Sequence, residues 1–252
     1  MNVSIWDFAR DTLTRLVVGA PVFWVPVWTA DGRRIVYTAN RTGAFNLYTR
    51  DADGSGAEQR LTTSTQHQVP NSMLPDGSFL LAAQLHPKTA WDIVKLPLSG
   101  TSTATEVLVS TPASEFAANI SPNGRFFAYQ SAETGRFEIL VRPYPEAGRR
   151  QWQISSGGGF APVWAHNGRE LFYLDGDSHT LMSVDVDTSG ADLKVGKPKP
   201  LLHRSYFGTF YPYDVSLDGQ RFLFIKEPPA TNTIEVIVNW AEELRARLTA
   251  KQ

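Results

Sequence analysis

The sequence has 252 residues, of which 42% are hydrophobic and 12% aromatic, so the chain can bury a sizeable core. Charged residues make up only 19%, fewer than in an average soluble protein, which argues against a helical bundle or a coiled coil. The chain has no cysteine, which excludes disulfides and Cys-based metal sites. Its net charge is −1, so there is no electrostatic reason to expect nucleic acid as a partner.

The N-terminal residues MNVSIWDFARD lack a basic region followed by an apolar one, so no signal peptide is visible. The longest apolar stretch, Leu16 to Trp28, covers 13 residues and is interrupted by glycine and proline. A membrane-spanning helix needs about 20 residues, so no direct membrane insertion is expected. Within this region, Ile5–Ala9 and Leu13–Val17 have the composition of two strands.

Five later segments repeat one pattern, in which an apolar run, a polar turn ending in glycine and a second apolar run follow each other. The turn glycines recur every 44 to 51 residues: Gly32, Gly77, Gly124, Gly168 and Gly219. Asp-Gly and Asn-Gly supply the positive φ angles of tight hairpin turns. The run after each turn is rich in aromatic and branched residues, as in Arg34–Ala39 or Phe126–Tyr129, and this composition predicts a strand.

A third apolar run follows in every repeat, and a fourth follows in most of them. The third runs are Phe45–Arg50, Asp92–Leu96, Phe137–Arg142, Leu181–Asp185 and Ile234–Trp240; the fourth are Glu58–Thr62, Thr105–Val109, Gln151–Ser155 and Pro200–His203. Four short strands in a period of about 45 residues match one blade of a β-propeller. A β-sandwich also uses glycine turns, but the near-constant period favours an all-β propeller of four-stranded antiparallel blades.

The two ends of the chain suggest how such a ring would close. The N-terminal strands resemble the last half of a blade, and Tyr213–Trp240 supplies three strands and then stops. Sharing one blade between the termini predicts six blades, five contiguous and one shared, in a single domain over residues 1–252. The alternative is the C-terminal part of a longer propeller. Beyond Trp240, AEELRARLTA has the charge order of a short terminal helix.

The repeats resemble those of the TolB-like, WD-like β-propellers. The resemblance is carried by PVWTADGRRIVYTA, NLYTRDADGSGAEQRLT and ISPNGRFFAYQS, which match the family's P-x-W-S-P-D-G-x-x-I-A-F followed by D-x-D-G-S. The second half, including YDVSLDGQRFLFIKE and VIVNWAEELRARL, resembles the C-terminal propeller of bacterial serine/threonine kinase-type sensor proteins. The resemblance implies a bacterial, extracytoplasmic (periplasmic) sensor domain that binds proteins or ligands.

Catalytic motifs are missing from the sequence. It contains no G-x-S-x-G elbow, no HExxH, no glycine-rich nucleotide loop and no HRD or DFG sequence, so the expectation leans against an enzyme. The glycine run Ser155–Phe160 lacks the following helix and lysine of a phosphate loop and is interpreted as a flexible inter-blade connection.

A cofactor is not expected, with calcium as the one alternative. Asp51, Asp53 and Ser55 stand at the first three ligand positions of a calcium loop with Gly56 at the sixth. Thr62 stands at the twelfth position, where a bidentate Glu is required. A hairpin turn explains the same residues, and the resembling family uses the run as a turn.

The candidate binding residues lie on the connections between blades, which in a propeller open around the mouth of the central channel. Aromatic and Arg side chains are enriched in binding surfaces. The predicted binding residues are Trp24, His67, Glu115, Phe160, Tyr206, Phe207, Phe210, Tyr211 and Asp214. For the aromatic residues the alternative is packing between blades, and for Glu115 and Asp214 it is a solvated loop carboxylate.

These observations predict a non-catalytic propeller that binds a protein, peptide or small-molecule ligand at the channel mouth. The alternative is a propeller hydrolase or lactonase with a divalent cation in the channel. Convergence of at least three of Glu115, Asn119, Asp214, His67 and Asn71 would favour that alternative.

Overall fold

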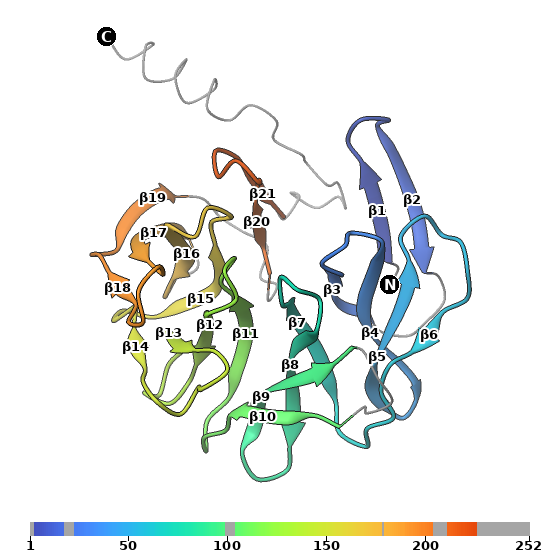
Figure 1. Ribbon diagram of the computed structural model, residues 1–252, viewed down its shortest axis with the longest axis horizontal. Helices are drawn as coiled ribbons and strands as arrows, with labels where there is room; N and C mark the ends of the chain where they lie inside the picture. The colour runs from blue at the N-terminus through green and yellow to red at the C-terminus, as the bar shows by residue number, and fades with distance from the viewer. Residues whose placement is uncertain (1–2, 18–22, 99–103, 178, 204–210, 226–252) are drawn as a thin grey trace.

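The computed structural model describes residues 3–17, 23–98, 104–177, 179–203 and 211–225. These residues form strands and turns with no helix, and the strands build separate antiparallel sheets arranged around a common centre (Figure 1). The expected terminal helix and the expected strand Ile234–Trp240 lie outside the described residues.

Three sheets have the expected four strands in sequence order. The first blade contains β3 (Phe23–Trp28), β4 (Arg34–Thr42), β5 (Ala44–Asp51) and β6 (Gln59–Arg60). The second contains β7 (Gln68–Met73), β8 (Phe79–His86), β9 (Ala90–Pro97) and β10 (Glu106–Val109). The third contains β11 (Glu115–Ile120), β12 (Phe126–Ser131), β13 (Glu138–Pro143) and β14 (Trp152–Gln153).

The fourth blade has its outer strand in two pieces. It contains β15 (Gly159–Trp164), β16 (Glu170–Asp175) and β17 (Thr180–Asp187), and both β18 (Lys194–Val195) and β19 (Lys199–His203) pair with β17. The repeat pattern of four-stranded antiparallel blades is therefore confirmed, with fourth strands often shorter than the sequence indicates.

Two smaller sheets flank these four blades. The N-terminal hairpin of β1 (Val3–Asp7) and β2 (Thr12–Val17) packs Val3, Leu16 and Val17 against the first blade. The hairpin of β20 (Tyr213–Val215) and β21 (Phe222–Phe224) packs against the fourth blade. Each hairpin lies where another blade would continue the ring, and the number of blades remains a prediction.

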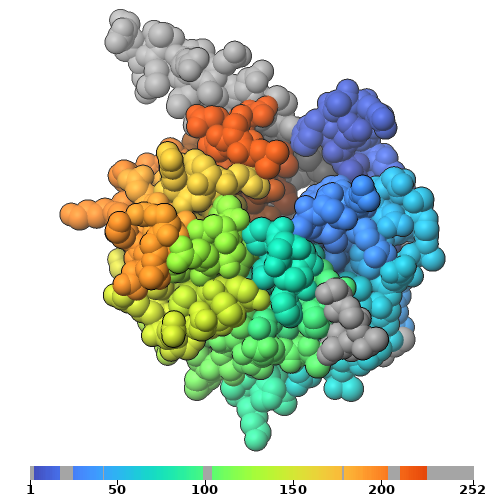
Figure 2. All heavy atoms as spheres, in the orientation of Figure 1, coloured from blue at the N-terminus to red at the C-terminus, as the bar shows by residue number. Residues whose placement is uncertain are grey.

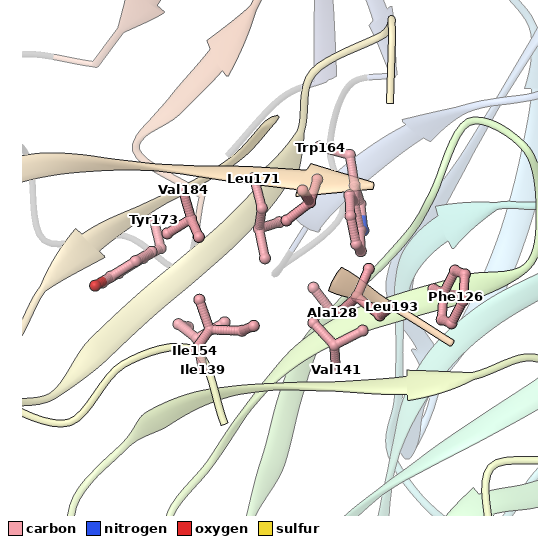
Figure 3. Close-up of a cluster of buried hydrophobic side chains, with 11 residues drawn as sticks. Phe126, Ala128, Ile139, Val141, Ile154, Trp164, Leu171, Tyr173, Val184 and Leu193 are labelled. Carbon is pink, nitrogen blue, oxygen red and sulfur yellow. The ribbon is translucent and has the colours of Figure 1, made fainter. Parts of the chain in front are cut away.

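Neighbouring blades bury apolar side chains between their faces. Between the third and fourth blades, β12 and β13 contribute Phe126, Ala128, Ile139 and Val141, and the fourth blade contributes Trp164, Leu171, Tyr173 and Val184 (Figure 3). Strand residues alternate between two faces, so each blade presents one apolar row to each neighbour.

The innermost strands share a β-bulge near their starts. The register shifts between Trp24 and Val27 in β3, between Phe116 and Asn119 in β11, and between Phe160 and Val163 in β15. In each bulge one non-glycine residue has a positive φ: Val25 at 46°, Ala117 at 54° and Ala161 at 50°. A bulge re-aims side chains at the end of a sheet, which is where the candidate site begins.

Candidate binding face and channel

A strip of aromatic rings crosses the second, third and fourth blades at the end where the inter-blade connections lie. Trp91 of β9 contacts Phe116 of β11 at 5.0 Å between ring centroids. Phe116 contacts Phe137 at 6.4 Å, and Phe137 contacts Phe160 of β15 at 5.7 Å. First and third strands of an antiparallel blade start at the same end, so these rings lie on one face. We call these four residues the aromatic strip.

The rings of the aromatic strip are half-buried, so each keeps part of its surface open to solvent. Such ring pairs are worth about 0.5–1.5 kcal/mol beyond burial, so the strip both joins blades and presents an apolar surface. Arg136 lies beside it with an exposed side chain, held by its Nε to Glu138 at 2.9 Å and by its Nη2 to the Ser156 carbonyl at 3.1 Å.

His67 occupies the corresponding place between the first and second blades. Its ring lies 4.6 Å from the Phe45 ring, and its Nδ1 accepts a hydrogen bond from the Phe45 backbone N–H at 3.0 Å. The predicted binding residue His67 therefore serves as a joint between the two blades through one ring nitrogen.

One hydrogen bond joins distant parts of the ring across its centre. Asn71 Nδ2 of β7 donates to the Tyr211 hydroxyl, just before β20, at 3.0 Å. Burial raises the pKa of Tyr211 far above its ordinary value, so the hydroxyl stays neutral. In Figure 2 atoms of the second and third blades, in teal and green, meet near the centre of the molecule.

The amide side chains of the innermost strands bind neighbouring backbone. Asn71 Oδ1 accepts from the Ala118 N–H at 3.3 Å, and Asn119 Oδ1 accepts from the Trp164 N–H at 3.1 Å. The Trp164 indole N–H donates to the Asn119 carbonyl at 2.9 Å. These amides therefore connect consecutive first strands, with their oxygens already occupied.

Glu115 is fully buried at the start of β11, so the alternative of a solvated loop carboxylate is wrong for this residue. Its Oε1 accepts from Thr111 Oγ1 at 2.5 Å and from Ser131 Oγ at 3.3 Å, while Oε2 has no hydrogen-bond partner among the described residues. Burial raises the pKa of Glu115, and the carboxylate of Asp92 adds to this rise.

Asp214 of β20 is reached by solvent, yet protein surrounds it closely enough to raise the pKa of its carboxyl. Its Oδ1 accepts the Val215 N–H at 2.8 Å, and His166 partly opposes the rise in pKa. An accessible carboxyl with a raised pKa is the kind of group that a general acid or base requires.

Within the described ranges, no group of three or more His, Asp or Glu side chains is arranged to hold a metal ion. In the segment weighed as an alternative calcium loop, Asp51 Oδ1 lies 3.1 Å from Arg34 Nε, and Asp53 Oδ1 accepts the Ser55 N–H at 2.8 Å. These contacts are those of a charged hairpin turn. No helix in the described part of the chain is long and apolar enough to cross a membrane.

The predicted binding residues are only partly brought together. Phe160 lies in the aromatic strip, Tyr211 binds Asn71, and Asp214 lies in β20. The Trp24 side chain and the residues Tyr206, Phe207 and Phe210 lie outside the described part. Sequence reasoning missed Trp91 and Phe137, although Phe137 opens the third run of its repeat, as Phe45 does, and Trp91 directly precedes the third run of the second repeat.

Comparison with known proteins supports the fold. No protein-family model and no curated protein matches the chain. A putative TolB from Agrobacterium tumefaciens superposes with a TM-score of 0.69 at 16% identity, over 91% of this chain and 79% of that one. TolB from Acinetobacter baumannii gives 0.69 at 15% identity, over 90% and 54%.

A periplasmic gluconolactonase of Pseudomonas aeruginosa, PpgL, gives a TM-score of 0.57 at 15% identity, over 94% of this chain and 77% of that one. The chain spans about half the length of the Acinetobacter TolB, as its 54% coverage shows. At these identities the likeness concerns the fold, which is a TolB-like β-propeller.

Proposed function

We propose that this propeller is a non-catalytic module that binds a protein or peptide on its connection face. The observation that supports the proposal is the aromatic strip, a row of four partly exposed rings, each in contact with the next, with the cation of Arg136 beside them. Aromatic side chains with a neighbouring Arg are the residue types that carry most binding energy in protein interfaces. TolB propellers share the fold.

The internal hydrogen bonds of the channel favour binding over chemistry. The carboxamide oxygens of Asn71 and Asn119 accept backbone N–H groups, and His67 Nδ1 does the same. These three groups would have to break structural hydrogen bonds to act as metal ligands through those atoms. The aromatic strip, in contrast, can be covered by a partner without loss of an internal bond.

The test is a selection of peptides from a random phage-displayed library on the immobilised chain, followed by affinity measurements on the variants Trp91→Ala and Phe160→Ala. These residues are the two ends of the strip, so their removal leaves the Phe116–Phe137 contact in place. We expect selected peptides to bind each variant at least about 10-fold more weakly.

The matched control is Leu217→Ala, which removes an exposed leucine, 81% accessible, from the β20–β21 turn at the opposite end of the molecule. Peptide affinity should be unchanged in this variant. Circular dichroism of each variant reports whether the sheets are intact. Equal peptide affinity for the folded Trp91→Ala and Phe160→Ala variants would refute the proposed binding face.

A second candidate function, a hydrolase or lactonase acting in the channel, is favoured by Asp214. This carboxyl is accessible, its pKa is raised, and the Tyr211 hydroxyl lies three residues away in sequence. A gluconolactonase also shares the fold. If this function holds, a chromogenic lactone should be hydrolysed with a rate that Asp214→Asn abolishes, and calcium should raise the melting temperature.

A further inference from the structure

A cleft of about 310 Å³ opens between the first and second blades at the end opposite the aromatic strip. Its mouth lies between the β3–β4 and β7–β8 turns, including Ala30, Asp31 and Asp76. The two turns nearly touch, because a Cβ added at Gly77 would lie 3.6 Å from the Ala30 Cβ. The volume is at the lower end of the range for small-molecule sites.

The cleft exists because the first blade lacks a ring that the third blade has. In the third blade, Phe126 opens β12 and packs edge-on against Trp152 of β14, with 5.8 Å between ring centroids, inside the core shared with the next blade. The corresponding residues of the first blade are Arg34, which opens β4, and Gln59 of β6. Arg34 Nη2 donates to Gln59 Oε1 at 2.8 Å, and the space of a ring stays open.

The inner wall of the cleft combines apolar side chains with one unpaired hydroxyl. Val36, Leu61, Met73 and Leu98 line it and continue the core between the two blades. Thr49 also lines it and is only 2% exposed, and its Oγ1 has no hydrogen-bond partner within the described part of the chain. A buried hydroxyl without a partner is costly, so a polar ligand atom that hydrogen-bonds it would relieve this cost.

The mouth of the cleft carries negative charge. Asp31 Oδ1 accepts hydrogen bonds from the Thr29 hydroxyl and the Arg33 N–H, and Asp76 Oδ1 accepts them from the N–H and hydroxyl of Ser78. These bonds lower the pKa of both carboxyls, which therefore stay ionised. The charge of Arg34 is compensated by Asp51 at 3.1 Å. Arg33 lies near Asp31, so Asp76 is the less compensated of the two carboxylates.

We propose that this cleft binds a small aromatic amine. The ammonium group pairs with the carboxylates at the mouth, above all Asp76. The ring fills the space that Phe126 and Trp152 occupy in the third blade, where it contacts Met73 and Leu61 and the guanidinium of Arg34. A polar ring substituent hydrogen-bonds the Thr49 hydroxyl. This site is separate from the connection face and does not depend on the proposed function.

Three probes of the same shape separate these contributions. Tyramine carries the ammonium, the ring and a phenolic hydroxyl; phenethylamine lacks the hydroxyl; 4-hydroxyphenylacetate replaces the ammonium by a carboxylate. We expect tyramine to bind with a dissociation constant of roughly 0.1–1 mM, as its size allows. Phenethylamine should bind about 5-fold more weakly, and 4-hydroxyphenylacetate should show no saturation-transfer signal.

Two variants and one control variant then locate the binding on the intact chain. Thr49→Val should make tyramine and phenethylamine bind equally, because the only change is the loss of the hydroxyl. Asp76→Asn should weaken both amines about 3-fold to 5-fold, and Asp218→Asn, which alters the matching turn of β20–β21, should weaken neither.

Three outcomes would overturn the proposal. In the first, no amine binds, and the cleft holds only solvent. In the second, 4-hydroxyphenylacetate binds as well as tyramine. In the third, the folded Thr49→Val variant still prefers tyramine over phenethylamine.

Discussion

At the scale of single residues, Glu115 combines full burial with an unpaired carboxylate oxygen. Burial penalises the charged form, and only one of its two oxygens receives compensating hydrogen bonds, from Thr111 and Ser131. The same position in the second blade is the neutral Gln68, which pairs with Gln84 through its Nε2 at 2.8 Å. A neutral side chain is therefore compatible with the start of a first strand.

We predict that Glu115→Gln removes a contribution to the free energy of unfolding that grows as the pH falls. A carboxyl whose pKa is raised on folding holds its proton more tightly in the folded protein. Its contribution therefore favours folding below the unfolded pKa and is lost as the pH rises through the folded pKa. The variant should be at least as stable as the parent at neutral pH, and this advantage should shrink as the pH falls towards the ordinary Glu range.

The measurement is urea unfolding of both proteins at several pH values between the Glu range and neutrality. Asp214→Asn is the comparison, because Asp214 also has a raised pKa but is reached by solvent. Its effect on the pH dependence should be the smaller one. A parent and a Glu115→Gln variant with parallel pH profiles would contradict the assignment.

At the scale of elements, the glycine run between β14 and β15 is explained by close approach of backbones. Gly158 has a φ of +99°, and its N–H donates to both Glu138 carboxylate oxygens at 3.1 Å. A Cβ added to Gly158 would lie 2.6 Å from the Gly176 Cα. The run is therefore an inter-blade connection, as expected from sequence, but it is closely packed where the sequence indicated a flexible segment.

We predict that Gly158→Ala lowers the free energy of unfolding by about 2–4 kcal/mol, because strain at positive φ adds to a backbone clash. Gly135→Ala is the matched control, since Gly135 also has a positive φ, +87°, but a Cβ there would meet nothing within 4 Å. It should cost only about 1 kcal/mol. Denaturant unfolding measures both, and equal losses would show that the contact with Gly176 is unimportant.

The strands were predictable from sequence and the site was predictable only in part. Turn glycines and β-branched runs locate hairpins through local chemistry, so strands such as β4 and β12 begin at their predicted residues. The aromatic strip depends on which rings meet across blades, and this is set by the shared bulge as well as by spacing. Repeat alignment would have identified Trp91 and Phe137; the burial of Glu115 required the three-dimensional packing.

At the scale of the whole molecule, contacts run mainly between neighbouring blades, as expected for a repeat architecture. The hydrogen bond between Asn71 and Tyr211 is different, because it joins the second blade to the segment leading into β20, 140 residues later. A contact of this kind couples the second blade to the β20–β21 hairpin, which nearest-neighbour packing leaves apart.

We predict that Tyr211→Phe lowers the free energy of unfolding by about 1–2 kcal/mol, because Asn71 Nδ2 loses its acceptor in a partly buried place. Asn71→Ala should cost more, since it also removes the acceptor of the Ala118 N–H. The double variant should cost less than the sum, because both single variants break the same cross-channel bond. Urea unfolding followed by circular dichroism and by tryptophan fluorescence measures these losses, and strictly additive losses would show that the bond does not couple the two sides. If the bond contributes to cooperativity of the ring, the two probes should also report coincident transitions in the parent and separated ones in Tyr211→Phe.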